Sequence, residues 1–299
     1  MKIVNIIGGL GNQMFQYAFA IALKEKNPQE EVFVDTSHFR YFFFKRYKGM
    51  NLHNGFEIDR VLDGPVLPQA SWRKLIRVSY YMPNYLLSRI IRKLAPARKR
   101  EYIEKMDFTY DPQALTQAGD VYYEGYWQAY QYFEDVKDDI RDAFQFRDID
   151  STNLKMIRLF HSGNSVSIHV RRGDYVSNKG FGGICELEYY QKAIDLVKSK
   201  IEAPEFYIFS NDIKWCEQNI KPLIEPYPCS FIIHNKGKDS YKDMELMSHC
   251  KTNIIANSSF SWWAAFLNHN QDAWVIAPCK WNNYFDKTDI YPPIWTKVE

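Results

Sequence analysis

Two arginines, a glycine and an aspartate follow an apolar alternation in the stretch SIHVRRGDYV, residues 167–176. The alternation is typical of a strand, and a strand that ends in this way delivers two guanidinium groups to one edge of a sheet. Guanidinium groups bind phosphate oxygens bidentately, and the glycine lets the backbone turn sharply beside them. We therefore expect Arg171 and Arg172 to bind a diphosphate. A surface ion pair between Arg172 and Asp174 is the alternative interpretation.

A second polar cluster, NSSFS at residues 257–261, opens a segment with helical spacing. Serine hydroxyls and backbone N–H groups at the start of a helix donate hydrogen bonds to an anion, and the helix dipole favours its charge. A simple helix cap is the alternative. The diphosphate interpretation gains support if both clusters lie at the same edge of one sheet.

The elements that position both clusters alternate along the second half of the chain. The strand candidates are SVSIHV, EFYIFS, SFIIHN, TNIIAN and AWVIAP, and the helical candidates are ELEYYQKAIDLVKSK, IKWCEQNI, SYKDMELMSHC and SFSWWAAFLNHN. This alternation predicts a parallel sheet with helices on both faces, in which ligands bind beyond the carboxyl ends of the strands. Polar residues that follow the strands are Arg171, Arg172, Asp174, Asn211, Asp212, Asn235, Ser258, Ser259 and Ser261.

The first half begins with an apolar run, a glycine-rich turn and a helical pattern, in KIVNIIGGLGNQMFQYAFAIALKEKN. Two further strand candidates, EEVFVDT and DVYYEGYWQ, predict an α/β layer with irregular insertions. We expect one domain over residues 1–155 and a second over residues 156–299. The GGLGNQ turn lacks the third glycine of the dinucleotide fingerprint, and no P-loop motif occurs, which disfavours hydride transfer and ATP hydrolysis.

Composition excludes other classes. With 38 basic and 36 acidic residues the formal charge is +2, which argues against a nucleic-acid partner. Five scattered cysteines without CxxC spacing indicate neither a disulfide framework nor a zinc site. We expect neither a signal peptide nor a membrane span of roughly 20 apolar residues, and therefore a cytoplasmic protein. Asp148 and Asp150 form a D-x-D pattern in a charged turn after a helical stretch, where solvated charge is the favoured interpretation.

One segment departs from this balance of charge. Residues 71–100 hold nine Lys or Arg and no Asp or Glu, interleaved with Trp, Tyr, Leu and Ile. A solvated basic face on a helical insertion explains this pattern. Peripheral attachment to an anionic membrane explains it equally well, because each basic residue near such a surface contributes about 1 kcal/mol.

A reaction at the diphosphate needs a base and a surface for the ligand's rings. Asp174, His169 and Glu186 are candidates for the base, because they lie near the arginines in sequence. Trp262 and Trp263 offer flat apolar faces, and we expect one of them to be buried and the other to lie near the ligand.

Three stretches, GGLGNQMFQYAFA at residues 8–20, HVRRGDYV at 169–176 and NSSFSWWAAFLN at 257–268, together resemble the α-1,2-fucosyltransferases of glycosyltransferase family 11. The H-x-R-R motif also occurs in α-1,6- and protein O-fucosyltransferases, whereas the first stretch separates family 11 from those. The resemblance implies a GT-B fold, in which two Rossmann-like α/β domains face each other across a cleft. The C-terminal domain would bind GDP-β-L-fucose, and residues 1–155 would form the acceptor side.

The resemblance also assigns roles to residues. Arg171 would bind the β-phosphate with support from Arg172, and Asp174 is retained with them as a catalytic candidate. Asp243 would pair with guanine, and His169 would lie against the nucleoside. The remaining residues that the resemblance places around the donor, the transferred sugar or the acceptor are Ser210, Asn211, Asp212, Asn257, Ser258, Ser259, Phe260, Ser261, Gly9, Asn12 and Gln13.

The function implied is inverting transfer of L-fucose to the 2-hydroxyl of a terminal galactose in a glycan acceptor, with no cofactor and no metal. The implied setting is a bacterial cytoplasmic enzyme of O-antigen or capsule synthesis, with residues 71–100 in peripheral contact with the inner membrane. No oligomeric state is predicted. A fucosyltransferase of another linkage, α-1,6 or protein O-linked, is the nearest alternative. The second is a non-catalytic protein that binds glycans or nucleotide sugars.

Overall fold

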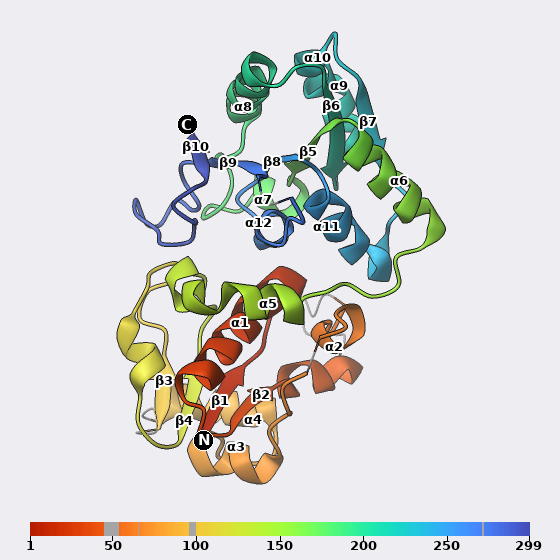
Figure 1. The fold of residues 1–299 in the computed structure, drawn as a ribbon. Helices are drawn as coiled ribbons and strands as arrows, with labels where there is room; N and C mark the ends of the chain where they lie inside the picture. The colour runs from red at the N-terminus through yellow and green to blue at the C-terminus, as the bar shows by residue number, and fades with distance from the viewer. Residues whose placement is uncertain (45–53, 65, 96–99, 271) are drawn as a thin grey trace. The chain divides into compact units, whose positions relative to one another are not determined.

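The computed structural model describes residues 1–44, 54–64, 66–95, 100–270 and 272–299, and the side chains of residues 41–44 and of Asp174 lie outside this description. The chain forms two compact units, Met1–Arg147 and Asp148–Glu299. Both are α/β units built on a parallel sheet (Figure 1).

The sheet of the first unit has the strand order β2-β1-β4-β3. Its strands are β1 (Lys2–Asn5), β2 (Val32–Asp35), β3 (Glu101–Ile103) and β4 (Val121–Glu124). Helix α1 (Leu10–Lys26) packs along β1 and β2, and α3 (Trp72–Val78) and α4 (Tyr85–Leu94) cover the other face. The short elements are α2 (Ile58–Val61), α5 (Lys137–Ala143) and the 3-10 helices η1 (Ser37–Phe44), η2 (Pro112–Thr116), η3 (Tyr130–Tyr132) and η4 (Glu134–Val136).

A buried carboxylate organises the core of this unit. Asp35, at the end of β2, is 1% exposed and accepts hydrogen bonds from the hydroxyls of Tyr80 (2.6 Å) and Tyr122 (2.9 Å) and from the backbone N–H of Ser37 (2.9 Å). Burial and the nearby Asp35 raise the pKa of both tyrosines, so their hydroxyls remain donors. A buried carboxylate is tolerated when several donors form hydrogen bonds to it. These hydrogen bonds join β2 to β4 and to the segment after α3.

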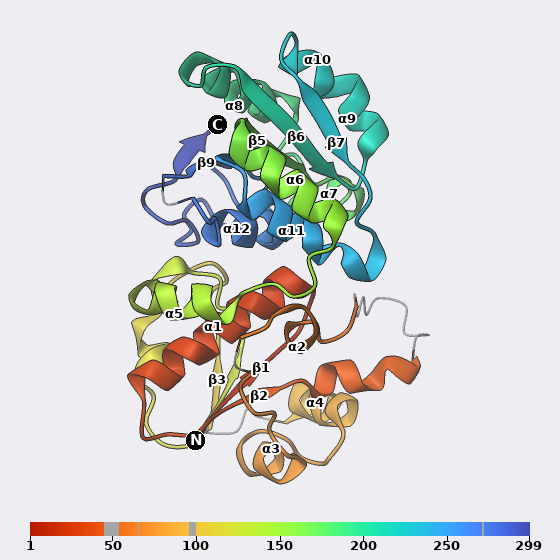
Figure 2. The same cartoon turned by 45° about the vertical axis from the view of Figure 1, so that its right-hand side comes forward.

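The sheet of the second unit has the strand order β10-β9-β8-β5-β6-β7, and every pair is parallel. Its strands are β5 (Asn164–Val170), β6 (Pro204–Ser210), β7 (Cys229–Ile232), β8 (Thr252–Ile254), β9 (Trp274–Pro278) and β10 (Thr296–Val298). Figure 2 shows α6 (Ser151–Ser162), α11 (Tyr241–Ser248) and α12 (Ser259–Phe266) on one face. The other face carries α8 (Leu187–Lys200), α9 (Ile213–Asn219) and α10 (Lys221–Ile224). The short α7 (Gly173–Val176) and η5 (Gly237–Asp239) lie in the connections.

All eight strand candidates are present, and two strands, β3 and β10, were not expected from the sequence. Helix α6 was not expected either, and Asp150 explains where it begins. The Asp150 carboxylate accepts hydrogen bonds from the backbone N–H groups of Thr152 and Asn153, each at 3.0 Å, and lies 3.0 Å from Nζ of Lys242. The D-x-D aspartate therefore serves as a helix cap.

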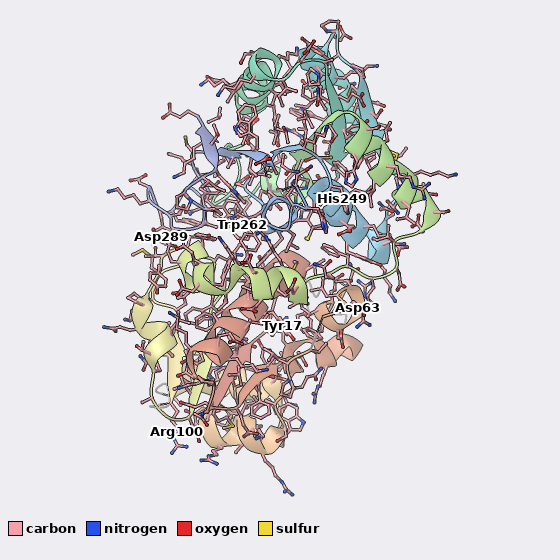
Figure 3. The ribbon with its side chains drawn as sticks, in the orientation of Figure 1. Tyr17, Asp63, Arg100, His249, Trp262 and Asp289 are labelled. Atoms are coloured by element: carbon pink, nitrogen blue, oxygen red, sulfur yellow. The ribbon has the colours of Figure 1, made fainter. Side chains whose placement is uncertain are left out.

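The expectation for the two tryptophans was wrong. Trp262 and Trp263 are both completely buried. Trp262, labelled in Figure 3, stacks on Phe266 with 5.1 Å between the ring centres, and its ring also lies 4.9 Å from that of Trp263 and 5.4 Å from that of Trp295. Its indole N–H donates to the carbonyl of Ile290 at 2.9 Å. Because α12 is short and apolar on all sides, both rings enter the core.

Residues 71–95 form α3, α4 and their connection, and much of their charge is paired within the unit. Arg92 lies between Glu101 (3.1 Å) and Glu124, Arg77 contacts Asp120 (2.8 Å), and Lys74 contacts Glu31 (3.3 Å). Residues 96–99 lie outside the described residues. Along the described parts of the chain, the helices are all too short or too polar to cross a membrane.

Candidate functional site at the carboxyl edge of the second sheet

The predicted arginine pair leaves the sheet from a central strand. Strand β5 pairs with β6 on one side and β8 on the other, and its last residue, Val170, is in register with Ser210. The Ser210 hydroxyl donates to the carbonyl of Val170 at 2.9 Å. The backbone N–H of Arg172 donates to the Asn211 side-chain oxygen at 3.0 Å. The structure therefore brings the predicted residues after β5 and β6 together.

Each guanidinium group lies over an aromatic ring that the sequence analysis did not assign to the site. The Arg171 guanidinium carbon lies 5.3 Å from the centre of the Tyr175 ring, and that of Arg172 lies 4.1 Å from the centre of the Trp215 ring. Cation–π attraction of this kind holds a guanidinium near the ring and leaves its N–H groups available to an anion. Tyr175 and Trp215 follow β5 and β6 closely, which is the signal that would have identified them.

Arg172 also forms an ion pair, with Asp212, and the pair with Asp174 stays a prediction. Its Nε atom lies 3.3 Å from the Asp212 carboxylate, whereas the side chain of Asp174 lies outside the described part of the chain. Asp212 is itself held, because its other oxygen accepts from the backbone N–H of Trp215 at 3.2 Å and caps α9. Arg172 is thus fixed by a carboxylate and a ring.

Gly173 permits the close approach of the two loops. Its φ is +37°, and a Cβ atom at this position would lie 2.4 Å from the side-chain nitrogen of Asn211. Both the backbone conformation and the lack of space favour glycine here.

His169 is a buried neutral imidazole beneath the arginines. It is 7% exposed, and its pKa falls to about 3 because burial disfavours the charged form and Arg171 adds like charge. Its ring lies 5.8 Å from that of Phe260, and Nδ1 has no hydrogen-bond partner among the residues that the structure describes. With this pKa, His169 is a poor general base near neutral pH, which disfavours one of the three base candidates.

The NSSFS cluster lies at the same edge, after β8, and divides into two groups. Asn257 is buried, and its amide donates to the carbonyls of Phe181 (3.0 Å) and Trp281 (3.2 Å). Ser261 is also buried, and its hydroxyl donates within the turn, to the carbonyls of Ala256 and Ser258. Ser259 and Phe260 are partly exposed at the start of α12. Asn257 and Ser261 therefore shape the turn. Ser258, the N-cap of α12, is also buried, at 6% exposed, so Ser259 and Phe260 are the members that reach the surface.

Asp243 lies in the first turn of α11, at the same end of the sheet. Its pKa rises to about 7 because of burial, although the Asn235 amide donates to it at 2.8 Å. Asn235 in turn exchanges hydrogen bonds of 2.9 and 3.1 Å with the amide of Asn153, on α6. Asn153 was not expected from the sequence, where its only signal is its position three residues after the Asp150 helix cap. This network holds a carboxylate that ionises near neutral pH.

The N-terminal motif forms a strand–turn–helix unit in the first unit. Gly8 has a φ of +83°, and a Cβ there would lie 2.8 Å from the Asn12 side chain. Gln13 is completely buried, and its amide bonds to the backbones of Gly8 (2.9 Å), Gly55 (2.8 Å) and Glu57 (2.8 Å). Gln13 thus stabilises the turn. Gly9 at the N-cap of α1 and the partly exposed Asn12 lie at the helix start.

Comparison with known proteins identifies the family. The model of glycosyl transferase family 11 matches residues 70–299. The chain belongs to glycosyltransferase family 11. An alpha-1,2-colitosyltransferase of Escherichia coli is 31% identical over 99% of this chain and 98% of that protein. The O-antigen biosynthesis glycosyltransferase WbnK of E. coli is also 31% identical, over 97% and 98%. The family 11 resemblance expected from the three motifs is confirmed.

Solved structures agree on the fold. This family 11 chain matches NodZ, an alpha-1,6-fucosyltransferase whose crystals were soaked with GDP-fucose, with a TM-score of 0.50 and 16% identity over 89% of this chain and 91% of NodZ. The α/β GT-B fold class expected from the sequence is confirmed. The family and its named relatives make the chain a glycosyltransferase.

A glycine substitution tests the geometry of the arginine turn. Gly173→Ala should lower the free energy of unfolding by about 1–3 kcal/mol, because it adds backbone strain and a clash with Asn211. Gly183→Ala is the matched control, since Gly183 has a φ of +74° and nothing within 4 Å of an added Cβ. Urea unfolding of both variants measures the difference, and equal losses would contradict the close approach of the two loops.

Proposed function

We propose that this family 11 glycosyltransferase transfers L-fucose from GDP-β-L-fucose to the 2-hydroxyl of a terminal galactose, with inversion and without a metal ion. The observation that carries the proposal is the pair of arginines at the end of β5, oriented by Tyr175, Trp215 and Asp212. In a chain with a formal charge of +2, an anionic donor must be bound by such a local concentration of positive charge.

The chemical step is a displacement at the anomeric carbon of fucose. The acceptor oxygen forms a bond to this carbon while the bond to the β-phosphate oxygen breaks, and the electron pair leaves with GDP. Arg171, supported by Arg172, would stabilise the charge that develops on the β-phosphate, which is the role a metal ion has in other enzymes. The start of α12, with Ser258 and Ser259, would add hydrogen-bond donors.

The proton of the acceptor hydroxyl requires a base. His169 is disfavoured because its pKa of about 3 leaves it little affinity for a proton. Asp174 and Glu186 are the remaining candidates from the sequence, and Glu186 is exposed at the start of α8.

The nucleoside would lie between α11 and the end of β5. A guanine base presents N–H donors along its Watson–Crick edge, and the Asp243 carboxylate accepts hydrogen bonds of this kind. His169 and Phe260 would contact the nucleoside from the β5 side.

The relatives support the 1,2 linkage over the alternatives. An alpha-1,2-colitosyltransferase matches nearly the whole chain, and a galactoside alpha-(1,2)-fucosyltransferase 1 of Lagothrix lagotricha is 25% identical over 87% of this chain and 63% of that protein. The first of these also favours a second candidate, transfer of colitose in the same linkage. Assays with both GDP-sugars decide between the two donors.

We also propose that the enzyme is cytoplasmic and that α4 binds it to the anionic surface of the membrane. This location suits O-antigen biosynthesis, the process for which the relative WbnK is named. Leu87, Ile90 and Leu94 share one exposed face of α4, and Leu94 is 85% exposed. Lys93 is exposed beside them. An apolar face flanked by basic residues is the pattern of a helix that lies in a membrane interface.

Turnover tests the donor site. Purified protein with GDP-fucose and lactose in EDTA should release GDP and form an α-1,2-linked product that NMR identifies. Arg171→Ala should lower kcat/KM at least ~100-fold, as the loss of one transition-state donor does in other enzymes. Arg158→Ala, an exposed arginine of α6, is the control. Donor binding without transfer across a panel of galactosides would contradict the proposal and favour a binding protein, and an α-1,6 product would contradict the linkage.

The pKa of Asp243 predicts how GDP affinity depends on pH. The Asp243 carboxyl has a pKa of about 7 in the protein without nucleotide, and only its ionised form accepts hydrogen bonds from both N–H groups of guanine. The affinity for GDP should therefore rise as the pH increases from 6 to 8. Asp243→Asn should bind more weakly and show less of this dependence. Calorimetry should measure the binding of guanosine as well as that of GDP. Guanosine has no phosphate, so its pH dependence reports the Asp243 carboxylate without titration of the phosphate. An unchanged pH profile in the variant would contradict the assignment.

Vesicle sedimentation tests the membrane contact. The parent should sediment with vesicles that contain anionic phosphatidylglycerol, and Ile90→Glu with Leu94→Glu should remain in the supernatant. Leu154→Glu with Leu159→Glu is the matched control, because both leucines are exposed on α6. Equal sedimentation of parent and α4 variant, or none by the parent, would contradict the role of α4.

A further inference from the structure

Two histidines and a glutamate meet at the end of the second unit opposite the arginines. Glu245 lies on α11, His249 follows α11 directly, and His269 follows α12. His249 is labelled in Figure 3. One ligand atom from each of the three side chains lies within 4.8 Å of the others. We refer to Glu245, His249 and His269 as the histidine cluster.

The sheet topology separates the cluster from the candidate donor site. His249 lies three residues before β8, and His269 lies five residues before β9, so both precede the amino ends of their strands. Arg171 and Ser258 instead follow carboxyl ends. The seven residues of β5 span about 20 Å at ~3.3 Å per residue, which sets the scale of this separation. The cluster is therefore not part of the machinery proposed for transfer.

The distances suit a small tetrahedral ion. His249 Nε2 lies 3.0 Å and His269 Nε2 lies 3.9 Å from the same Glu245 oxygen, Oε1. Two ligands of one tetrahedral Zn²⁺ are about 3.4 Å apart when each lies ~2.1 Å from the metal. The two observed distances fall on either side of that value, and one ligand atom of each side chain lies within 4.8 Å of the others. The three atoms can therefore surround one ion once an imidazole ring rotates to direct its lone pair at it.

The backbone segments that carry the ligands are held together. The imidazole rings of His249 and His269 stack with 4.2 Å between their centres and 3° between their planes. The backbone N–H of His269 donates to the carbonyl of Ser248 at 2.9 Å, and the adjacent Asn268 amide donates to the carbonyl of Cys250 at 2.7 Å. These bonds join the ends of α11 and α12 and keep the three residues close together. Because the two rings are parallel, the exposed His269 ring must rotate to direct its lone pair at an ion shared with His249.

Two further features are typical of metal sites. His249 Nδ1 forms a hydrogen bond of 3.2 Å with Nε2 of His161, at the end of α6, and metal-binding histidines use the second ring nitrogen in this way. In addition, Oε2 of Glu245 is buried and, within the described part of the chain, has no hydrogen-bond partner. A buried carboxylate oxygen without a donor is costly unless a cation compensates it.

We propose that the histidine cluster binds a divalent transition-metal ion of the Zn²⁺ class, with water as the fourth ligand. Imidazole and carboxylate ligands suit Zn²⁺, whereas Mg²⁺ and Ca²⁺ prefer oxygen ligands alone. The ion links α11 to the end of α12, and His161 extends the link to α6 as a positioning residue. Its role is to stabilise the second unit, and it takes no part in the transfer at the opposite edge.

The test begins with full-length protein freed of metal by EDTA and then of EDTA by dialysis. Titration with ZnCl₂ against a chromophoric chelator should show one site per chain, and Zn²⁺ should raise the Tm. Glu245→Gln and His269→Gln, which preserve side-chain size approximately, should abolish this site. His161→Ala should weaken it about 10-fold or more, as the loss of a ligand's hydrogen-bond partner does elsewhere. His234→Gln removes an exposed histidine outside the cluster and should leave the site unchanged.

Co²⁺ distinguishes the cluster from cysteine sites, because Cys279 is exposed and Cys185 and Cys229 are partly exposed. The Co²⁺ protein should show visible bands of four-coordinate cobalt without a thiolate charge-transfer band. Unfolding curves of the metal-free variants confirm that each one is folded. No binding by the parent, equal binding by the parent and the cluster variants, or a thiolate band would each overturn the proposal.

Discussion

The proposed donor site depends on the position at which β5 leaves the sheet. At Val170 the chain passes from a strand with neighbours on both sides to a turn in which Gly173 lies against Asn211. Strand pairing fixes the backbone up to that residue, and the bonds of Ser210 and Asn211 fix it beyond. Arg171 and Arg172 therefore begin from a rigid base at the carboxyl edge, where α/β sheets bind ligands. A pair of arginines on a mobile loop would lose conformational entropy on binding a diphosphate, whereas this pair is already oriented.

The electrostatics of the unit follow from the same arrangement. Each guanidinium lies over an aromatic ring, and Arg172 has a carboxylate partner, so the positive charges are held in place before an anion arrives. His169 beneath them stays neutral because it is buried next to Arg171. Asp243 is partly buried, and its pKa of about 7 allows it to ionise at a small cost near neutral pH. The edge thus combines fixed positive charge, which suits an anion, with one carboxylate that suits hydrogen-bond donors.

The sequence predicted the second sheet and the grouping of the site residues well, because both depend on local pattern. Apolar β-branched runs identify strands, and residues directly after parallel strands meet at one edge. The ion pair between Arg172 and Asp212 could not be found in this way, since the two residues are 40 apart in the chain and meet because β6 pairs with β5. The complete burial of Trp262 and the hydrogen bonds of the Gln13 amide could not be predicted either, because both depend on packing between segments that are distant in sequence. Helix α6 was not predicted because charged residues surround its N-cap, Asp150, and this stretch was interpreted as solvated charge.

The central claim is that Arg171 binds the β-phosphate of a guanine nucleotide, and a comparison of GDP with GMP tests it most directly. Calorimetry of the parent should give tighter binding of GDP by about 10- to 100-fold, the range expected for charged hydrogen bonds worth ~1.5–3 kcal/mol. In Arg171→Ala this advantage should largely disappear, while GMP affinity changes little. If the variant keeps the full preference for GDP, the β-phosphate lies elsewhere and the account of the arginine pair is wrong.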